Sequence, residues 1–469
     1  MRRINIRILM FASAVLFAGC GIIRDYETPE QSNEVQEKLY RDQSDTDTLS
    51  IADIPWDEFF TDQLLQQLIN EGLEKNNDLQ VALQKIAEAQ AVFRQSKQNY
   101  LPSFNFNPNV TNNHQSKAAL NFPSNVNINL RTTTVQLPVG ASWELDVWGK
   151  LSSTKRSAMA SFFKADASAR AVQTQLIATI ATQYYSLLAL DQQLEITLKT
   201  LELRKKDLET IEAMKEVSLS DGVALAQTRA NVYAAEIMIP DLKRSIRETE
   251  NALSVLIGRV PGPIERGTMG NQHVTVDLKT GIPLKLLQNR PDVIAAEMAF
   301  RETFENVNVM RASFYPTLSI SAKAGISALT TNDLLTNSFF TTVSGGLLQP
   351  IYNNGINKMN LRRSEALQQQ AFFSFQQSLL VAGEEVSNAL YAYETTEEKQ
   401  RLRIEQISAL QESVDFTKEL LEYSTTTNYL DVITAEQALL TAELAGVNDH
   451  LQKYTAIIQL YRALGGGWK

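Results

Sequence analysis

Two pairs of segments with alternating polar and apolar residues constrain this chain more than any other feature. Alternation runs through residues 103–113 and 131–145, and it returns in residues 317–328 and 338–351. In a β-strand such alternation gives one apolar face and one polar face. These strands therefore either cover a soluble core or face lipid on one side and water on the other. Their length favours a membrane, because a tilted strand crosses a bilayer in about 9–11 residues.

The two strand pairs belong to an internal duplication. One set of matched residues is separated by 214 positions: Asp78, Ala82, Tyr100 and Pro102 match Asp292, Ala296, Phe314 and Pro316. A second set is separated by 206 positions: Gly149, Arg156 and Ala160 match Gly355, Arg362 and Ala366. Each copy reads helix, proline, strand, loop, strand, glycine and a pair of helices. We therefore expect one repeat over 61–282, ending in a Gly/Pro-rich connector at 258–282, and a second over 283–469.

Each copy also contains a very long helical pattern. Residues 150–216 and 356–422 contain no proline, and a helix of about 67 residues is roughly 100 Å long. Globular helices average about 11–12 residues, so two this long require an unusual architecture. Shorter helical patterns follow at 223–257 and 429–463. We therefore predict an α+β fold in which long antiparallel helical hairpins adjoin a small sheet.

The four expected strands of one chain are too few to close a barrel. In lipid, an open sheet edge leaves N–H and C=O groups unpaired at a cost of several kcal/mol each. Several chains must then share one barrel. Small multiples of four give 8 or 12 strands, and three chains with 12 strands would surround a water-filled bore. The helices would continue the tube beyond the membrane. The polar side chains expected to line the bore are Asn105, Asn107, Asn109, Ser319, Ser321 and Lys323.

The first residues have the character of an export signal. The first seven residues include Arg2, Arg3 and Arg7. The apolar run that follows, at 8–18, is too short to span a bilayer. The run ends in Leu-Phe-Ala-Gly before Cys20, which resembles the cleavage site of bacterial lipoproteins. We therefore expect lipidation at Cys20 and, because no acidic residue follows directly, export to the outer membrane. Residues 20–60 should be an extended segment whose end, at 51–60, docks onto the body.

Composition and motifs disfavour other functions. The 469 residues carry a formal net charge of −9, which argues against nucleic acid as a partner. The single cysteine and the three scattered histidines give no metal-ligand spacing, and no nucleotide-binding or hydrolase motif occurs. We therefore predict no catalytic residue, no metal and no cofactor. Downstream of the signal, no run of about 20 apolar residues predicts a membrane-spanning helix.

Several short stretches carry a family resemblance. They are 59–64 (FFTDQL), 77–79 (NDL), 99–103 (NYLPS), 286–297 (LLQNRPDVIAAE), 314–318 (FYPTL) and 428–432 (NYLDV). With them the chain resembles the TolC-like outer membrane efflux proteins, in the lipoprotein branch that serves RND pumps. The resemblance implies a homotrimer with a 12-stranded barrel and a periplasmic helical tunnel. Such a protein passively conducts substrates from an inner-membrane pump and a periplasmic adaptor to the exterior.

The resemblance also implies that the turns between the long helices meet the adaptor. The residues at these turns are Val217, Ser218, Leu219, Ser220, Ser424, Thr425, Thr426 and Thr427. Small polar residues also favour ordinary helix–helix turns, so both interpretations fit the sequence.

An acidic stripe is the candidate gate of the tunnel. Glu405, Glu412, Asp415, Glu419 and Glu422 lie 7, 3, 4 and 3 residues apart, which places them on one face of a helix. Like charges brought close together in several copies repel and raise each other's pKa, so protons or cations would bias opening. Glu412, Asp415, Glu419 and Glu422 are the gate candidates, and Asp415 is the best single choice. A solvated helix face is the plain alternative.

Two other functions remain open from the residues alone. One is the outer membrane duct of a protein secretion system, since the sequence does not specify the substrate. The other is a soluble periplasmic coiled-coil adaptor or scaffold, which long helical hairpins would also suit. The duplicated strand pairs disfavour the scaffold, because their apolar faces would have no partner.

Overall fold

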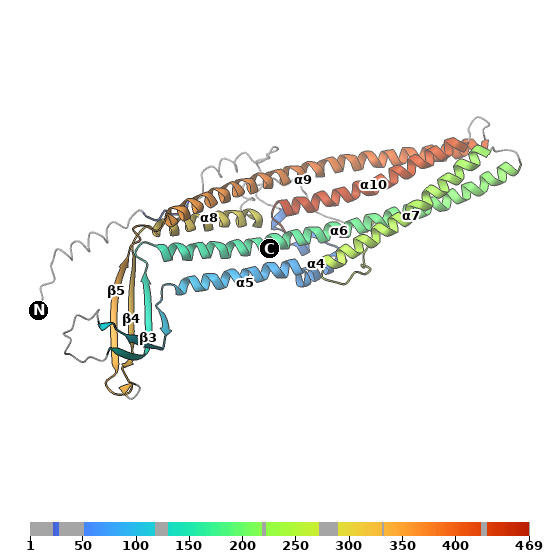
Figure 1. The fold of residues 1–469 in the computed structure, drawn as a ribbon. Coiled ribbons are helices and arrows are strands. Elements are labelled where there is room, and N and C mark those ends of the chain that lie inside the picture. The colour runs from blue at the N-terminus through green and yellow to red at the C-terminus, as the bar shows by residue number, and fades with distance from the viewer. Residues whose placement is uncertain are drawn as a thin grey trace. The chain divides into compact units, whose positions relative to one another are not determined.

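The structure, a computed structural model, describes residues 22–27, 51–117, 130–217, 222–271, 289–330, 333–423 and 429–468. It is mostly helical with one antiparallel sheet, as the predicted α+β class requires (Figure 1). The described residues form two compact units. Unit 1 comprises those within 22–27, 87–164 and 296–374, and unit 2 comprises those within 51–86, 165–295 and 375–468.

The element bounds follow the internal duplication. Helices α5 (Asn77–Gln98) and α8 (Pro291–Ala312) both have 22 residues, and α6 (Lys150–Glu216) and α9 (Ile356–Tyr423) have 67 and 68. The other elements are η1 (Ile51–Asp53), α3 (Trp56–Phe59), α4 (Gln63–Lys75), β1 (Ser103–Phe106), β2 (Asn109–His114), β3 (Arg131–Leu145), α7 (Gly222–Leu256), η3 (Met269–Asn271), β4 (Thr317–Ala328), β5 (Phe339–Leu348) and α10 (Tyr429–Ala463). The sequence therefore placed most long elements correctly, and β5 ends three residues before the expected limit of 351.

The sheet of unit 1 has four rows of strands. β3 pairs with β4, and β4 pairs with β5. The outer row beside β3 consists of β1 and β2, which share one continuous register and are separated by Asn107 and Pro108. Pro108 has no N–H to donate, whereas the Asn107 N–H still reaches the Pro138 carbonyl at 3.3 Å. The strand expected over 103–113 is therefore one row interrupted by a proline.

The register aligns side chains of one kind across all four rows. Phe104 lies opposite Ala141, Ala141 opposite Ala322, and Ala322 opposite Val343. One residue along, Ser142 lies opposite Ser321, whose hydroxyl is 2.8 Å from that of Ser344. Because directly paired residues point to the same face, one face of the sheet is apolar and the other polar. Phe104 and Val343 are 72% and 76% exposed, so the apolar face is uncovered in a single chain.

The backbones of β3 and β4 approach each other closely near the centre of this sheet. Pro138 of β3 lies opposite Gly325 of β4. A Cβ atom on Gly325 would lie 2.4 Å from the Leu137 carbonyl oxygen and 2.7 Å from the Pro138 Cα. A proline in an inner strand is unusual, and here the glycine beside it makes room for it.

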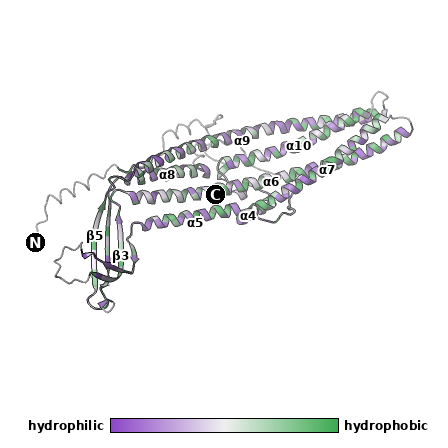
Figure 2. Ribbon diagram, viewed as in Figure 1, coloured by the Kyte–Doolittle hydropathy of each residue, from purple (hydrophilic) through white to green (hydrophobic). Residues whose placement is uncertain are grey.

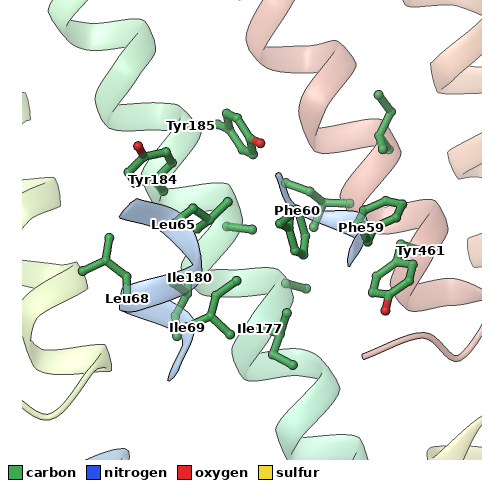
Figure 3. Close-up of a cluster of buried hydrophobic side chains, with 14 of the residues drawn as sticks. Phe59, Phe60, Leu65, Leu68, Ile69, Ile177, Ile180, Tyr184, Tyr185 and Tyr461 are labelled. Atoms are coloured by element: carbon green, nitrogen blue, oxygen red, sulfur yellow. The ribbon is translucent and has the colours of Figure 1, made fainter. Parts of the chain in front are cut away.

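The core of unit 2 gathers around the middle of α6. Tyr184 and Tyr185 of α6, residues of α4, and Tyr461 of α10 surround the short segment 51–60 (Figure 3). Phe59 stacks on Tyr461 with ring centroids 4.1 Å apart. Asp62 caps α4 by accepting from the Leu64 N–H, and it also accepts from the Tyr184 hydroxyl at 2.6 Å. Segment 51–60 therefore docks as predicted, although it forms η1 and α3 rather than an extended chain.

The helices of unit 2 are mixed in character along their length. Hydrophilic and hydrophobic residues alternate along α6, α7, α9 and α10 (Figure 2). None of the described helices carries the long apolar run needed to span a bilayer. α7 contains Pro240, which removes one internal hydrogen bond from a helix that the sequence pattern treated as regular.

The Gly325–Pro138 contact leads to a stability prediction. A Gly325→Ala substitution should lower the free energy of unfolding by about 1–3 kcal/mol, because the new methyl group meets backbone atoms that cannot move independently. Thermal unfolding in detergent, followed by circular dichroism, measures the change. Gly345→Ala in β5 is the control, since a Cβ there meets nothing within 4 Å. Equal melting temperatures for the two variants would contradict the steric explanation.

Candidate functional site

The acidic residues proposed for the gate lie on the last turns of α9. Glu412, Asp415 and Glu419 are all exposed, and the helix that carries them continues to Tyr423. The Gln411 amide donates to the Asp415 carboxylate at 3.1 Å. The side chain of Glu422 lies outside the described part of the structure. The three described carboxylates thus share one helix, as their spacing predicted.

The proposed adaptor-contacting turns lie between helix ends of unit 2. α6 ends at Glu216 before α7 begins at Gly222, and α9 ends at Tyr423 before α10 begins at Tyr429. In Figure 1 these four helix ends lie together at one end of the unit. Val217 is described and 65% exposed. The remaining candidates lie outside the described residues: Ser218, Leu219, Ser220, Ser424, Thr425, Thr426 and Thr427.

Beside these helix ends the structure brings together a group of polar residues that sequence analysis did not single out. We call it the tip cluster: Asp207 of α6, Lys418 of α9, and Tyr429 and Glu436 of α10. The Lys418 ammonium lies 2.6 Å from the Glu436 carboxylate. Asp207 Oδ2 and Tyr429 Oη are shielded from solvent. The cluster therefore places two carboxyl groups and one ammonium where three helices meet.

Burial and like charge change the acidity of the tip cluster. Burial, together with the neighbouring Glu436 carboxylate, raises the pKa of Asp207 to about 6. Burial also raises the pKa of the Tyr429 hydroxyl, which is further disfavoured from ionising by Asp207 and Glu436. Burial disfavours the charged form of Lys418, but its ion pair with Glu436 more than compensates and raises the lysine pKa. Asp207 thus titrates within reach of physiological pH.

Arg204, one turn away from Asp207, links α6 to α7 and α10. It is 4% exposed, and its guanidinium donates to the Asn231 carbonyl at 2.8 Å and to the Gln437 side chain at 2.6 Å. Asp207 lies four residues before Ile211, which is fully buried. Charged residues at the buried positions of a helix were the available sequence signal for this cluster.

The Arg-Pro-Asp motif of residues 290–292 has a structural role in unit 2. Arg290 is 3% exposed and makes a two-pronged contact with Asp292 at 3.0 and 2.6 Å. Its guanidinium also donates to Glu385 of α9 at 2.7 Å and to the Ala463 carbonyl at the end of α10 at 3.0 Å. Pro291 is the first residue of α8, where a missing N–H costs nothing. The motif therefore joins the start of α8 to α9 and α10.

Possible cation ligands do not gather within the described ranges. No three His, Cys, Asp or Glu side chains converge there on a position that a metal ion could occupy.

Comparisons with known proteins identify the family and the fold of the chain. A family model described as outer membrane efflux protein matches residues 68–259 and 282–466. The chain is 26% identical to the probable outer membrane lipoprotein SilC of Salmonella typhimurium, over 99% of both chains. It is also 26% identical to the toluene efflux pump outer membrane protein TtgC of Pseudomonas putida, over 97% of this chain and 94% of that protein. The solved structure of the outer-membrane channel OprN superimposes with a TM-score of 0.85 at 24% identity, covering 96% of this chain and 100% of that one.

The raised pKa of Asp207 predicts a pH-dependent stability. Since the folded state favours the protonated carboxyl, its contribution to the free energy of unfolding is largest below the unfolded pKa of about 4 and is lost as the pH rises through about 6. Asp207→Asn should therefore be more stable than the wild type at pH 7.5, by about 1–3 kcal/mol, and the difference should shrink towards pH 4.5. Melting temperatures of detergent-solubilised protein at the two pH values measure this. Glu209→Gln, on the exposed face of α6, is the matched control, and a pH-independent offset for Asp207→Asn would count against the interpretation.

Proposed function

The chain belongs to the outer membrane efflux protein family, and on that premise we propose that three copies assemble into one export channel. The protein is an outer membrane efflux channel of a Gram-negative bacterium. The single observation that supports the trimer is the sheet of unit 1. This sheet has one apolar face, one polar face and four rows of strands. One outer row is formed by β1 and β2 and the other by β5, and each outer row has one unpaired edge in the described chain. Three copies would supply 12 rows and leave no edge exposed to lipid.

In this assembly the two faces of the sheet take different solvents. The apolar face, with Phe104 and Val343, would meet lipid, and the polar face, with Ser321 and Lys323, would line a water-filled bore. The long helices of unit 2 would form the periplasmic part of the duct. The soluble periplasmic scaffold is no longer a candidate, because the family is one of outer membrane proteins.

We further propose that Cys20 carries lipid after removal of residues 1–19. The relative SilC is named a probable outer membrane lipoprotein, and it aligns with nearly the whole of this chain. Each buried CH₂ of an acyl chain contributes about 0.8 kcal/mol, so a site with several chains anchors stably.

The partners follow from the family and from the helix ends. The relative TtgC is named an efflux pump outer membrane protein. We propose that this chain likewise serves a tripartite system with an inner-membrane RND-type pump and a periplasmic adaptor. The adaptor would dock at the two turns at 217–220 and 424–427. Family members are channels, and we propose that the pump supplies the work while this chain performs no catalysis and needs no cofactor.

We propose that Glu412, Asp415, Glu419 and Glu422 act as the gate near the periplasmic end of the duct. Three copies of this acidic face would concentrate negative charge around one axis. Repulsion between the copies would favour opening, and cations or protons would relieve it.

The gate proposal predicts an altered channel. Asp415→Ala removes one carboxylate from each copy, so the preference for cations should fall by roughly twofold or more and the conductance should change. Single-channel recording of purified protein in a planar bilayer measures both quantities. Glu248→Ala, which removes an exposed carboxylate from α7, is the control. A channel with the wild-type conductance and selectivity would remove the support for Asp415, and absence of any channel in the wild type would overturn the duct itself.

Docking at the helix ends predicts a site-specific crosslink. Val217→Cys should form an adduct with a co-expressed adaptor, because its exposed side chain lies at the end of α6. Val255→Cys in α7 is equally exposed, at 64%, and serves as the control. On the lipidation proposal the native Cys20 is blocked, so each variant presents one free thiol. Adducts that form equally well from both positions would contradict docking at the helix ends.

A further inference from the structure

A short N-terminal segment, residues 22–27, lies against α8 in unit 1. We call it the strap. Tyr26 sits between aromatic rings, with centroid distances of 5.8 Å to Phe300 and 5.5 Å to Phe304, the latter edge-on. The Arg301 guanidinium lies 5.2 Å from the centre of the Tyr26 ring. The strap therefore has a side-chain anchor formed by three residues of one helix.

The backbone of the strap is held as well. The Arg24 N–H donates to the Asn308 side-chain oxygen at 3.2 Å, and the Asn308 amide donates back to the Arg24 carbonyl at 2.9 Å. One side chain thus satisfies both backbone groups of one residue, as a neighbouring strand would. Asn308 has no exposed surface, so its amide is committed to this contact.

An ion pair with a buried carboxylate orients that amide. The Asn308 amide also donates to Glu305 at 3.3 Å, and Glu305 binds Arg156 of α6 through two hydrogen bonds of 2.7 and 3.0 Å. Glu305 is 2% exposed. The Glu305 carboxylate, and more weakly Asp25 of the strap, hold the pKa of Arg156 above its usual value despite its burial. An ion pair that is largely removed from water contributes little net stability, but it fixes geometry.

The internal duplication shows that this arrangement is not part of the shared scaffold. α5 and α8 correspond residue for residue, and the counterparts of Glu305 and Asn308 in α5 are Ala91 and Arg94. The counterpart of Arg156 is conserved in kind as Arg362 of α9. The carboxylate and the amide therefore occur in one copy alone, and the chain has one N-terminal strap for them to hold.

The strap also reaches the junction between the sheet and α6. A Cβ atom on Gly149, just before α6, would collide with the end of the Ile23 side chain, whereas the corresponding Gly355 has open space around it. Ile23 therefore lies where β3 ends and α6 begins. Ile23 lies three positions after Cys20, and such a stretch spans at most about 10 Å.

We propose that Asn308, Glu305 and Arg156, with the aromatic rings of Phe300 and Phe304 around Tyr26, form a seat that holds the lipidated N-terminus beside the ends of the barrel strands. This rests on the proposed lipidation of Cys20. A strap held at Arg24 restricts the acyl chains to the neighbourhood of the strand ends. The lipid therefore enters the membrane at the level where the apolar face of the sheet begins. A loose tether of the same composition would anchor the chain without positioning it.

Proteolysis of the full-length protein tests the seat. Arg24 has an exposed side chain but a bound backbone, so trypsin should release the peptide of residues 20–24 slowly from wild-type channels in detergent. Asn308→Ala and, independently, Tyr26→Ala should each speed the release about tenfold, because cleavage follows the population of the unseated strap. Asn306→Ala is the control: on the same helix it loses a hydrogen bond from Ser157 but does not touch the strap. Mass spectrometry of the released peptide gives its rate of appearance and its acyl content.

The outcomes separate the seat from the lipid and from the channel. Faster release of an acylated peptide from Asn308→Ala and Tyr26→Ala, with wild-type release from Asn306→Ala, supports the proposal. Wild-type release from both strap variants overturns it, whatever the conductance of the channel. A peptide without acyl groups overturns the anchoring role even where the rates differ, and it leaves the conductance of the channel as a separate question.

Discussion

The unpaired backbone edges of the sheet are the constraint on which the rest of the structure depends. In lipid each unpaired N–H or C=O costs several kcal/mol, and β5 alone is ten residues long. A few such groups outweigh the 5–15 kcal/mol of stability typical of a whole domain. The sheet therefore has no stable place in a membrane until neighbouring copies complete its rows. The outer row carries Pro108, whose missing N–H also makes that edge a poor template for incorrect pairing.

The long helices are subject to a different constraint, which is that each must pack against its neighbours in one register. Hairpins with a repeating apolar pattern can slip past one another by one repeat and still bury similar surface. Buried polar contacts prevent this in unit 2: Arg290 contacts α9 and the end of α10, and Asp449 of α10 binds Lys399 and Arg403 of α9. Such contacts add little net stability, but a slipped register would leave each charge buried without a partner.

The sequence predicted the elements whose pattern is local. The strand over 317–328 and the helix over 150–216 agree with β4 and α6 because alternation and the absence of proline act within one segment. The interruption at Pro108 and the proline within α7 were missed, since a strong flanking pattern hides a single residue. The turns containing Ser218 and Thr425 lie outside the described residues, so their role remains a prediction.

The tip cluster was beyond prediction for a different reason. Asp207 and Glu436 lie more than 200 positions apart, on helices whose contact is decided by the fold. Each alone is an ordinary carboxylate on a long helix, and the pKa of Asp207 rises because the fold buries this carboxyl and places Glu436 beside it. The acidic stripe ending at Glu422, by contrast, was visible because its spacing repeats along one helix.

Duplication explains the architecture, and departures from it indicate where the two copies do different work. The counterparts of Asp207 and Lys418 in the other copy are Ser413 and Glu212, so the charged groups of the tip cluster are not repeated at the matching positions. The seat of the strap is likewise confined to α8. Two hairpins with the same backbone plan are thus held by different polar contacts. The protonation of Asp207 bears on the polar contact of α6 with α9 and α10, whereas α6 and α7 also meet through the apolar side chains of Leu201, Val232 and Ala235.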